Sequence, residues 1–369
     1  MSVITGAYGF QLKAPGSPLE RVELAPLEPV DDQVIVEVAG CGVCHTDIGF
    51  AVDGVPTRHS LPLILGHEIS GRVVAGGEES TDWIGKAVIV PAVIPCEACA
   101  ACKAGRPTIC RQQFMPGNHG HGGFATHVLV PSRGLCPVPD SLPEGIALSD
   151  LSVVADAVTT PLEAIRRADL TADHVAVFIG VGGVGGFGVQ LASAFGAAVV
   201  AIDVDHNRLH LAAEHGADLV LSAKELDLKA TKRSIRTFVK ESGRQDLGLK
   251  IFETSGTPAG QQTAFGLLDP GAHLAVVGFS MEKLELRLSN LMAFDATAQG
   301  NWGSAPERYP EALDLVLRGD VVLGPYVETV PLEEAPAVVQ AVAEHKTRRR
   351  MVLVPGPDGA GFRSEEENA

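Results

Sequence analysis

Four cysteines lie close enough in the sequence to bind one metal ion. They form the pattern C-x2-C-x2-C-x7-C, made of Cys96, Cys99, Cys102 and Cys110. Four thiolates at this spacing can surround a tetrahedral zinc ion, and a site whose four positions are all filled by protein leaves no place for substrate. We therefore predict a structural zinc site, with disulfides or ordinary buried or free cysteines as the alternatives.

A second set of possible ligands is more scattered. Cys44 is followed by Thr46, and His67 and Glu68 follow Gly66. Taken singly, Cys44 is typical of a small buried residue and His67 of a core or loop histidine. Thiolate and imidazole together nevertheless suit zinc, and a catalytic zinc needs only three protein ligands. These residues therefore indicate a catalytic metal site whose third ligand lies elsewhere in the chain.

A glycine-rich motif after an apolar run indicates a dinucleotide site. The motif is Gly180-Val-Gly182-Gly183-Val184-Gly185. Its glycines allow a tight turn and bring backbone N–H groups close to a pyrophosphate at a helix N-terminus. Asp203 follows 18 residues after the motif, where an acid accepts hydrogen bonds from the adenosine ribose. Because this carboxylate would repel a 2′-phosphate, we predict NAD over NADP, with Arg208 as the nearest cation for a phosphate; a glycine-rich turn without a ligand is the alternative.

The elements that must hold these residues differ before and after residue 150. Before it, short β-rich runs broken by Gly and Pro are typical of an irregular strand-dominated unit; after it, strands alternate with helices, which predicts a parallel doubly wound sheet. The segment 324–354 is expected to rejoin the first part, and the polar tail 355–369 to be mobile. The strands expected after residue 150 are 175–179, 198–202, 219–221, 250–253 and 273–278, and the helices are 185–195 and 207–215.

Length and charge limit the classes of function. The chain has 369 residues, 46% of them hydrophobic, which is enough for two cores. A net charge of -16 argues against nucleic acid or an anionic membrane as a general partner. The sequence has neither a recognisable secretion signal nor an uncharged stretch of about 18 residues. We therefore expect a cytoplasmic protein, whose clustered thiols are more often metal ligands than disulfides.

The order of these motifs resembles that of the zinc-containing alcohol dehydrogenases of the medium-chain dehydrogenase/reductase family. The resemblance spans about residues 30–355 and includes Gly66-His67-Glu68-x2-Gly71-x5-Gly77, the four-cysteine loop and the nucleotide motif. It implies an α/β fold with a GroES-like β-rich catalytic domain at 1–157 and 301–369. A Rossmann domain, a doubly wound parallel sheet, would occupy 158–300, with the active site in a cleft between the two. It also implies a homo-oligomer, either a dimer or a tetramer.

The resemblance also implies roles for individual residues. Cys44 and His67 would be ligands of the catalytic zinc, with Glu68 beside the metal as a nearby or exchanging ligand. Thr46 would receive the alcohol proton. His45 matches a position that contacts the cofactor pyrophosphate. The cofactor contact near the C-terminus would come from Arg349, with the adjacent Arg350 as the alternative.

Two positions depart from the usual family pattern. Asp156 stands where the third zinc ligand is often cysteine, and a carboxylate oxygen is acceptable to zinc. Gly49 stands where well-known members carry a histidine that continues the proton relay. His59 is the candidate replacement, or ribose hydroxyls and water complete the relay and His59 is an exposed loop histidine. His119 and His121 are expected at the surface, with a role at the mouth of the cleft as the other possibility.

A closer resemblance is to the 6-hydroxycyclohex-1-ene-1-carbonyl-CoA dehydrogenases within that family. It is carried by stretches that include 38–47, 92–96, 115–118, 123–127 and 288–303. It implies an acyl-CoA substrate from anaerobic aromatic degradation, whose ring alcohol is oxidised with NAD. Dehydrogenases of simple secondary alcohols or polyols are the alternative, and a non-catalytic, zinc-stabilised NAD-binding protein is the alternative of another class.

Overall fold

The chain folds as two units. The computed structural model describes residues 3–244 and 247–356, so most of the predicted mobile tail lies outside the described residues. The first unit contains the chain up to Thr159, Gly303–Leu317 and the chain from Tyr326 onward. The second contains Thr160–Trp302 and Arg318–Pro325. The return of the chain to the first unit after the nucleotide-binding region agrees with the expectation for segment 324–354.

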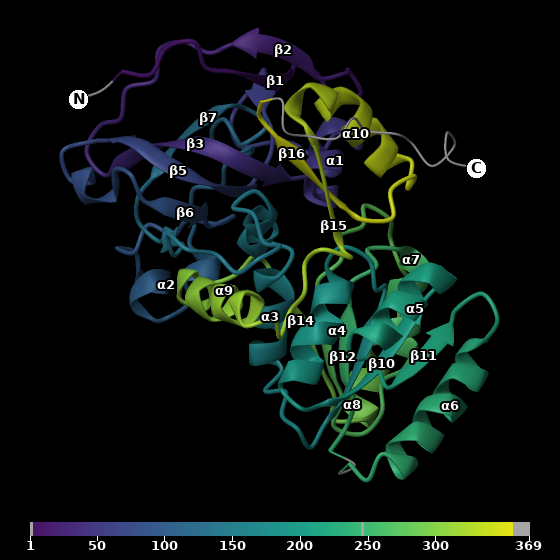
Figure 1. Cartoon of the computed structure of the whole chain (residues 1–369). Helices are drawn as coiled ribbons and strands as arrows, with labels where there is room; N and C mark the ends of the chain where they lie inside the picture. Colours follow the sequence, from purple (N-terminus) through teal and green to yellow (C-terminus); the bar gives the residue numbers. More distant parts are fainter. Residues whose placement is uncertain (1–2, 245–246, 357–369) are drawn as a thin grey trace. The chain divides into compact units, whose positions relative to one another are not determined.

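The first unit is built mainly from antiparallel strands. One sheet has the order β15-β16-β3-β5-β6-β8, with β7 also paired to β3, and a smaller sheet has the order β2-β1-β4 (Figure 1). Its central strand β3 is rich in β-branched residues and almost wholly buried, as expected for a strand inside a core. The strands are β1 (Tyr8–Leu12), β2 (Glu20–Glu23), β3 (Gln33–Gly42), β4 (Leu63–Ile64), β5 (Glu68–Gly76), β6 (Ala87–Val90), β7 (His127–Pro131), β8 (Cys136–Pro137), β15 (Val327–Pro331) and β16 (Arg350–Val354). The helices are α1 (His45–Ala51), α2 (Ala100–Lys103), α9 (Tyr309–Leu317) and α10 (Ala335–Ala343).

The second unit is a six-stranded parallel sheet with helices between its strands. The strand order is β11-β10-β9-β12-β13-β14, so the chain reverses direction across the sheet next to β9. Strands β10, β11, β12 and β14 of this sheet are labelled in Figure 1. The prediction of a doubly wound parallel sheet is therefore confirmed. The strands are β9 (Val175–Ile179), β10 (Ala198–Asp203), β11 (Leu219–Ser222), β12 (Lys250–Glu253), β13 (His273–Val276) and β14 (Thr297–Gly300). The helices are α4 (Gly185–Ala194), α5 (His206–Glu214), α6 (Leu228–Glu241), α7 (Pro258–Gly266) and α8 (Ser289–Ala293), while α3 (Thr159–Arg167) begins where the first unit ends.

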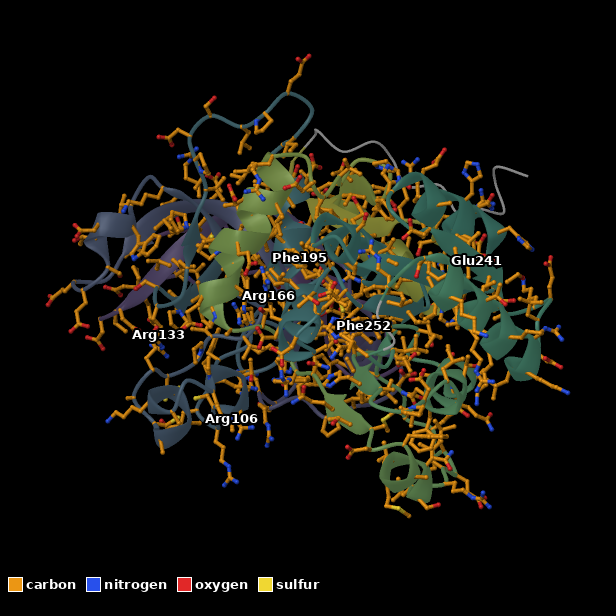
Figure 2. All side chains as sticks on the ribbon, turned by 90° about the horizontal axis from the view of Figure 1, so that it is seen from below. Arg106, Arg133, Arg166, Phe195, Glu241 and Phe252 are labelled. Carbon is orange, nitrogen blue, oxygen red and sulfur yellow. The ribbon has the colours of Figure 1, made fainter. Side chains whose placement is uncertain are left out.

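The core of the second unit follows from its apolar strands. Every residue of β9 and β10 is buried, as expected for strands covered on both faces. Phe178 of β9 and Phe252 of β12 stack with ring centroids 4.7 Å apart, and Figure 2 shows Phe252 among the packed side chains. At the edge of the unit the guanidinium of Arg166 lies 4.2 Å from the ring centroid of Phe195 (Figure 2). The stacking of Phe178 on Phe252 ties β9 to β12, and the glycine motif directly follows β9.

No helix within the described ranges is both long and apolar enough to cross a membrane.

Candidate functional site

Four possible metal ligands meet in the first unit. They are Cys44, His67, Glu68 and Asp156, and one ligand atom from each lies within 4.8 Å of all the others. Cys44 Sγ is 3.6 Å and His67 Nε2 is 3.7 Å from Asp156 Oδ2. Zinc with ligands at 2.0 to 2.3 Å separates neighbouring donors by about 3.3 to 3.8 Å in a tetrahedron. The donor set and its spacing therefore fit zinc.

The register of the first sheet brings these residues together. Gly42 at the end of β3 pairs with Glu68 at the start of β5 on one side and with Val352 of β16 on the other. A side chain at Gly42 would push the Glu68 carboxylate out of its place, because its Cβ would lie 2.1 Å from Glu68 Oε2. Cys44 follows two residues after this glycine. The ends of β3 and β5 thus bring Cys44, His67 and Glu68 to one place, and the start of β16 brings Arg350.

Asp156 reaches the site from a distant segment. It follows the short 3-10 helix Asp150–Ala155, which is almost completely buried. The Tyr309 hydroxyl donates a hydrogen bond to the carbonyl of Ala155 at 2.7 Å and accepts one from the backbone N–H of Ala92 at 3.0 Å. Burial raises the pKa of Tyr309, so its hydroxyl stays neutral. This buried phenol fixes the backbone directly before Asp156.

A fifth residue, Asp47, organises the ligands without joining them. Its buried side chain accepts hydrogen bonds from the backbone N–H groups of Cys44 and Gly66, each at 3.0 Å. Its Oδ1 also lies 3.3 Å from His67 Nδ1. A carboxylate at this position fixes the imidazole tautomer that leaves Nε2 free for a metal. Sequence reasoning did not assign this role, although an acid three residues after a ligand cysteine is in the right place to cap α1.

Replacing Asp47 with asparagine is expected to weaken zinc binding at this site by about 10- to 100-fold, since a partner of this kind orients the ligand imidazole. The amide of the variant would present an NH2 group to a cluster of N–H donors. The measurement is zinc retention against a competing chelator. Asp53→Asn, at an exposed position just after α1, is the matched control. Equal zinc retention by both variants would show that Asp47 does not orient His67 for zinc binding.

Arg350 neutralises part of the buried negative charge. Its Nε lies 3.0 Å from Glu68 Oε2, its Nη2 pairs with Glu68 Oε1, and Nη2 lies 3.9 Å from Asp156 Oδ2. Burial raises the pKa of Glu68 to about 7, while Arg350 acts in the opposite direction. The carboxylates of Glu68 and Asp156 and the thiol of Cys44 thus surround one guanidinium, and a divalent cation would complete the balance.

The remaining predicted residues of this region lie at different depths. Arg350 is the buried arginine, whereas Arg349 is exposed. Thr46 Oγ1 lies 3.7 Å from Cys44 Sγ, at the start of α1. His45 is exposed, and its ring stacks on that of His345 with centroids 5.5 Å apart.

The proposed relay residue His59 is not seen to join Thr46. Its Nδ1 lies 2.6 Å from the carbonyl oxygen of Ser60, and no hydrogen bond links it to Thr46 within the described residues. Its role in proton transfer therefore stays a prediction.

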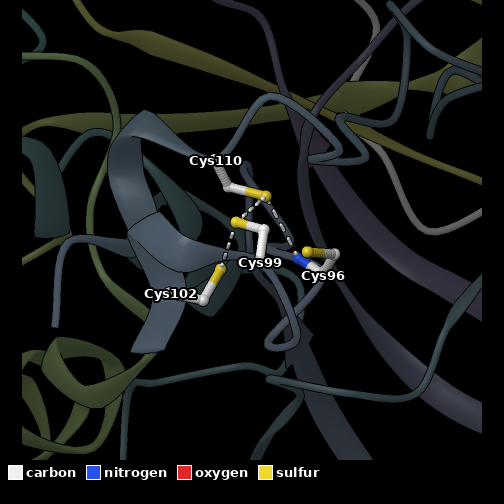
Figure 3. Close-up of side chains that lie close together, drawn as sticks. All are labelled: Cys96, Cys99, Cys102 and Cys110. Carbon is white, nitrogen blue, oxygen red and sulfur yellow. Dashed lines mark hydrogen bonds between the residues drawn. The ribbon is translucent and has the colours of Figure 1, made fainter. Parts of the chain in front are cut away.

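The four clustered cysteines form a separate site in the first unit. Their sulfur atoms lie within 4.8 Å of one another, and Figure 3 shows them converging from one loop. Cys99 Sγ is 3.5 Å from Cys102 Sγ and 3.8 Å from Cys110 Sγ. Sulfur atoms around a zinc ion with Zn–S bonds of about 2.3 Å lie about 3.8 Å apart. All four donors are protein thiols, so the set fits a closed structural zinc site.

The thiols of this four-cysteine site differ in pKa. The backbone N–H of Cys102 donates to Cys99 and, with neighbouring thiols, lowers the pKa of Cys99 to about 6. Burial and then the hydrogen bond with Cys99 raise the pKa of Cys102 to about 12. The pKa of Cys96 is lowered too, chiefly by the backbone N–H of Ala98, so Cys102 is the thiol whose proton a cation must displace as it binds.

In the second unit the glycine motif forms the turn between β9 and α4. Gly180 has a φ of +83°. A Cβ at Gly185 would lie 1.9 Å from the Gly180 carbonyl oxygen, so Gly185 permits the close packing of helix and strand. At Gly182 such a Cβ would meet only the Arg208 side chain within 4 Å, with Nη1 at 3.5 Å, so a flexible side chain alone borders the space beside this glycine. Gly183 and Val184 lead from this loop into α4. This space at a helix N-terminus fits a pyrophosphate.

Asp203 closes β10 beside this loop. Its Oδ2 accepts a hydrogen bond from the Val181 N–H at 2.7 Å, and its Oδ1 accepts one from the Asp205 N–H at 2.9 Å. The carboxylate is therefore fixed at the carboxyl edge of the parallel sheet, next to the point where the strand order reverses. Ligands of such sheets bind at this edge.

Comparison with known families matches both units. The sequence profile of the alcohol dehydrogenase GroES-like domain matches residues 30–140, and that of zinc-binding dehydrogenases matches residues 183–318. The chain belongs to the zinc-type alcohol dehydrogenases of the medium-chain dehydrogenase/reductase family, and it is therefore an oxidoreductase. The predicted combination of a GroES-like domain with a Rossmann domain is confirmed.

Individual relatives cover almost the whole chain. An alcohol dehydrogenase of Geobacillus stearothermophilus is 30% identical over 339 residues, which are 91% of this chain and 94% of the relative. The structure of galactitol-1-phosphate dehydrogenase from Escherichia coli has a TM-score of 0.84 at 25% identity, covering 94% of this chain and all of that one. A zinc-binding dehydrogenase from Sinorhizobium meliloti bound to NADP has a TM-score of 0.81 at 25% identity, covering 96% of this chain and all of that one.

Proposed function

We propose that the protein is an NAD-dependent zinc alcohol dehydrogenase that oxidises a secondary alcohol to a ketone. The observation that carries this proposal is the buried set of Cys44, His67, Glu68 and Asp156 beside the Thr46 hydroxyl. A non-catalytic NAD-binding protein would need the four-cysteine loop and the glycine turn only. The second ligand set around Arg350 would have no function in such a protein.

Zinc bound at this set would supply a Lewis acid that lowers the pKa of an alcohol hydroxyl and polarises the ketone in reverse. Thr46 is the group of this chain placed to accept the hydroxyl proton and pass it outward. Asp47 orients His67, and Arg350 holds Glu68 close enough to exchange with another ligand. NAD held at the glycine loop would supply the nicotinamide that accepts the carbinol hydrogen as hydride.

NAD as the preferred dinucleotide rests on Asp203. Its carboxylate is fixed by two backbone N–H groups and would accept hydrogen bonds from ribose hydroxyls. Arg208 lies over the glycine loop, where it can contact a phosphate, and His45 and Arg349 are proposed to contact the same cofactor. The Sinorhizobium meliloti relative binds NADP, so the preference of this chain depends on its own acid.

Replacing Asp203 with asparagine is expected to lower kcat/KM for NAD by about 10- to 100-fold, because hydrogen bonds to a charged group contribute about 1.5 to 3 kcal/mol. The value for NADP should rise, since the repulsion of its 2′-phosphate is removed. Initial rates with each dinucleotide measure both effects. Asp205→Asn is the matched control, because asparagine keeps the helix cap at that position. An unchanged NAD to NADP ratio in the Asp203 variant would contradict the assignment.

For the substrate we propose the ring alcohol of 6-hydroxycyclohex-1-ene-1-carbonyl-CoA, oxidised reversibly to the 6-oxo product. This substrate rests on the sequence stretches that resemble such dehydrogenases. In the reverse direction the product ketone is conjugated with the ring alkene, so hydride could also add at the β carbon. Polyols or simple secondary alcohols are the second candidate, which the likeness to galactitol-1-phosphate dehydrogenase favours.

The test is NAD reduction by zinc-loaded protein with three kinds of alcohol. They are the CoA ester, its free acid, and a panel of simple secondary alcohols and polyols. Turnover of the CoA ester alone supports the acyl-CoA substrate, whereas turnover of simple alcohols or polyols alone supports the second candidate. Absence of turnover with every alcohol would contradict the proposed activity. Analysis of the product formed with NADH and the enone then shows whether hydride reaches the β carbon.

We also propose a homo-oligomer in the cytoplasm. β14 is the last strand of its sheet and exposes backbone hydrogen-bonding groups, which favour pairing with another strand. Exposed apolar side chains lie before it in sequence, namely Phe279, Met281, Leu288 and Met292. Sedimentation equilibrium of the zinc-loaded protein measures the oligomeric state. A monomer at all concentrations would contradict this part of the proposal.

A further inference from the structure

Four nitrogen-bearing side chains gather on two loops of the first unit, outside both metal sites. Arg58 and His59 lie before β4, and His119 and His121 lie in the glycine-rich loop before β7. Asn118 joins the loops, because its side-chain oxygen accepts from the Arg58 N–H at 2.9 Å and its carbonyl accepts from the His59 N–H at 2.8 Å. We call these four side chains the loop cluster.

The second of these loops is fixed to the chain segment that carries the ligand His67. The N–H of Gly123 donates to the carbonyl of Gly66 at 2.8 Å. A Cβ at Gly122 would lie 2.2 Å from the same carbonyl oxygen, and one at Gly117 would lie 2.8 Å from the Gly66 nitrogen. The loop therefore packs backbone to backbone against the residue that precedes His67. The loop cluster is held by the same scaffold as the catalytic ligands.

The backbone fixes the tautomers of two histidines. The Ile64 N–H donates to His121 Nδ1, and the Met115 N–H donates to His119 Nδ1, each at 3.2 Å. A neutral imidazole that accepts at Nδ1 carries its proton at Nε2. Burial and then Arg58 lower the pKa of His119, while burial and then His59 lower the pKa of His121. Both rings thus present a neutral Nε2–H donor, which is unsuited to binding a metal.

The loop cluster lacks a negative partner in the described part of the chain. The charge of Arg58 acts on His119 and lowers its pKa, and the His59 ring lies 5.6 Å from that of His121, centroid to centroid. No ion pair joins any of the four to a carboxylate among residues 3–244 and 247–356, although the chain has 45 acidic residues. A guanidinium and several fixed N–H donors without an acid are suited to a carboxylate or phosphate.

We propose that the loop cluster binds an anionic group, carboxylate or phosphate, of the alcohol substrate. The inference rests on the proposed dehydrogenase function, because the anion would be the part of the substrate held away from the reacting carbinol. It assigns Arg58, His119 and His121 to substrate specificity. A neutral alcohol would gain nothing from these residues, whereas an anionic one would be bound and oriented by them.

The first arm of the test measures binding without turnover. Inorganic phosphate and acetate are titrated separately into the zinc-loaded full chain with saturating NAD, which occupies the glycine loop, and imidazole N–H signals are followed by NMR. We expect the anion to shift the His119 and His121 signals of the unmodified chain. Whichever of phosphate and acetate binds more tightly to that chain should bind about tenfold more weakly to the double variant Arg58→Ala, His121→Ala. If the double variant does not fold, the same titration is made on Arg58→Ala alone, whose replaced side chain is exposed. Arg111→Ala, another exposed arginine, is the control and should bind as the unmodified chain does.

The second arm compares an anionic alcohol with a neutral one. The double variant should raise KM for the free acid or CoA ester about tenfold and leave kcat/KM for cyclohex-2-en-1-ol unchanged. His121→Gln, which keeps an N–H donor, should restore part of the lost binding. An effect on the free acid points to the carboxylate, and an effect on the CoA ester alone points to phosphate.

The two arms separate this inference from the proposed function. If no alcohol is oxidised but phosphate or acetate still shifts both imidazoles, and the His119 signal of the double variant needs about tenfold more anion to shift, the dehydrogenase proposal fails and the anion site stands. Absence of any histidine shift with either anion overturns the anion site. Equal losses with neutral and anionic alcohols overturn it as well.

Discussion

Cys44→Ser is expected to lower kcat/KM for alcohol oxidation by at least about a thousandfold, because a Lewis-acid metal contributes several kcal/mol to such a reaction. A serine hydroxyl is a poor zinc ligand compared with a thiolate. NAD binding, which depends on the second unit, should not change. Steady-state rates and dinucleotide titration measure the two properties on the same preparation.

The matched control for this variant is Cys136→Ser. Cys136 is also buried in the first unit, and burial raises its pKa to about 12, so it is a neutral thiol outside both ligand sets. Its replacement should cost some stability and leave activity largely intact. If Cys44→Ser and Cys136→Ser lose activity equally, the loss reflects damaged packing, and the assignment of Cys44 to the metal is wrong.

Cys99→Ser is expected to act mainly on folding. The loop Cys96–Cys110 has little buried apolar surface of its own, and structural zinc contributes folding free energy directly. We expect a loss of about 3 kcal/mol, which corresponds to a Tm lower by about 6 to 12 °C for a unit of this size. Thermal unfolding followed by circular dichroism, with and without a chelator, measures this loss.

Comparing Cys44→Ser with Cys99→Ser tests whether one zinc site is catalytic and the other structural. The chelator should lower the Tm of the unmodified chain but have little further effect on Cys99→Ser. At temperatures well below its Tm, Cys99→Ser should keep most of its turnover. Equal loss of stability from Cys44→Ser and Cys99→Ser would contradict that division.

Local sequence patterns predicted much of the fold and the four-cysteine site. The ligands of that site lie within 15 residues, so spacing alone places their sulfur atoms together. The glycine motif and Asp203 belong to one strand–helix–strand unit, whose geometry is also local. In both cases the residues are close in the sequence, and the spacing of apolar residues predicts the strands and helices between them.

The second ligand set could not be derived from spacing. Asp156 is 112 residues from Cys44, and only the packing of a 3-10 helix under Tyr309 brings it to the site. The family resemblance proposed it, whereas the contacts of Asp47 appear only in three dimensions. Sequence position also could not separate Arg349 from its neighbour Arg350, because the register of β16 decides which guanidinium is buried.

The loop cluster shows the same limit for substrate specificity. His119 and His121 have no sequence pattern that distinguishes them from exposed loop histidines. Their roles depend on backbone N–H groups of Met115 and Ile64, which fix the tautomers, and on Asn118, which links the two loops.

Zinc content per chain tests the central claim most directly. Elemental analysis would be made on the unmodified chain, Cys44→Ser and Cys99→Ser, each purified with zinc and desalted under the same conditions. We expect two zinc ions in the unmodified chain and one in each variant. Turnover should fall in proportion to the loss of the zinc ion held by Cys44, His67 and Asp156. Two zinc ions retained by Cys44→Ser, or full activity in a chain that lacks the zinc ion at Cys44, His67 and Asp156, would contradict this assignment.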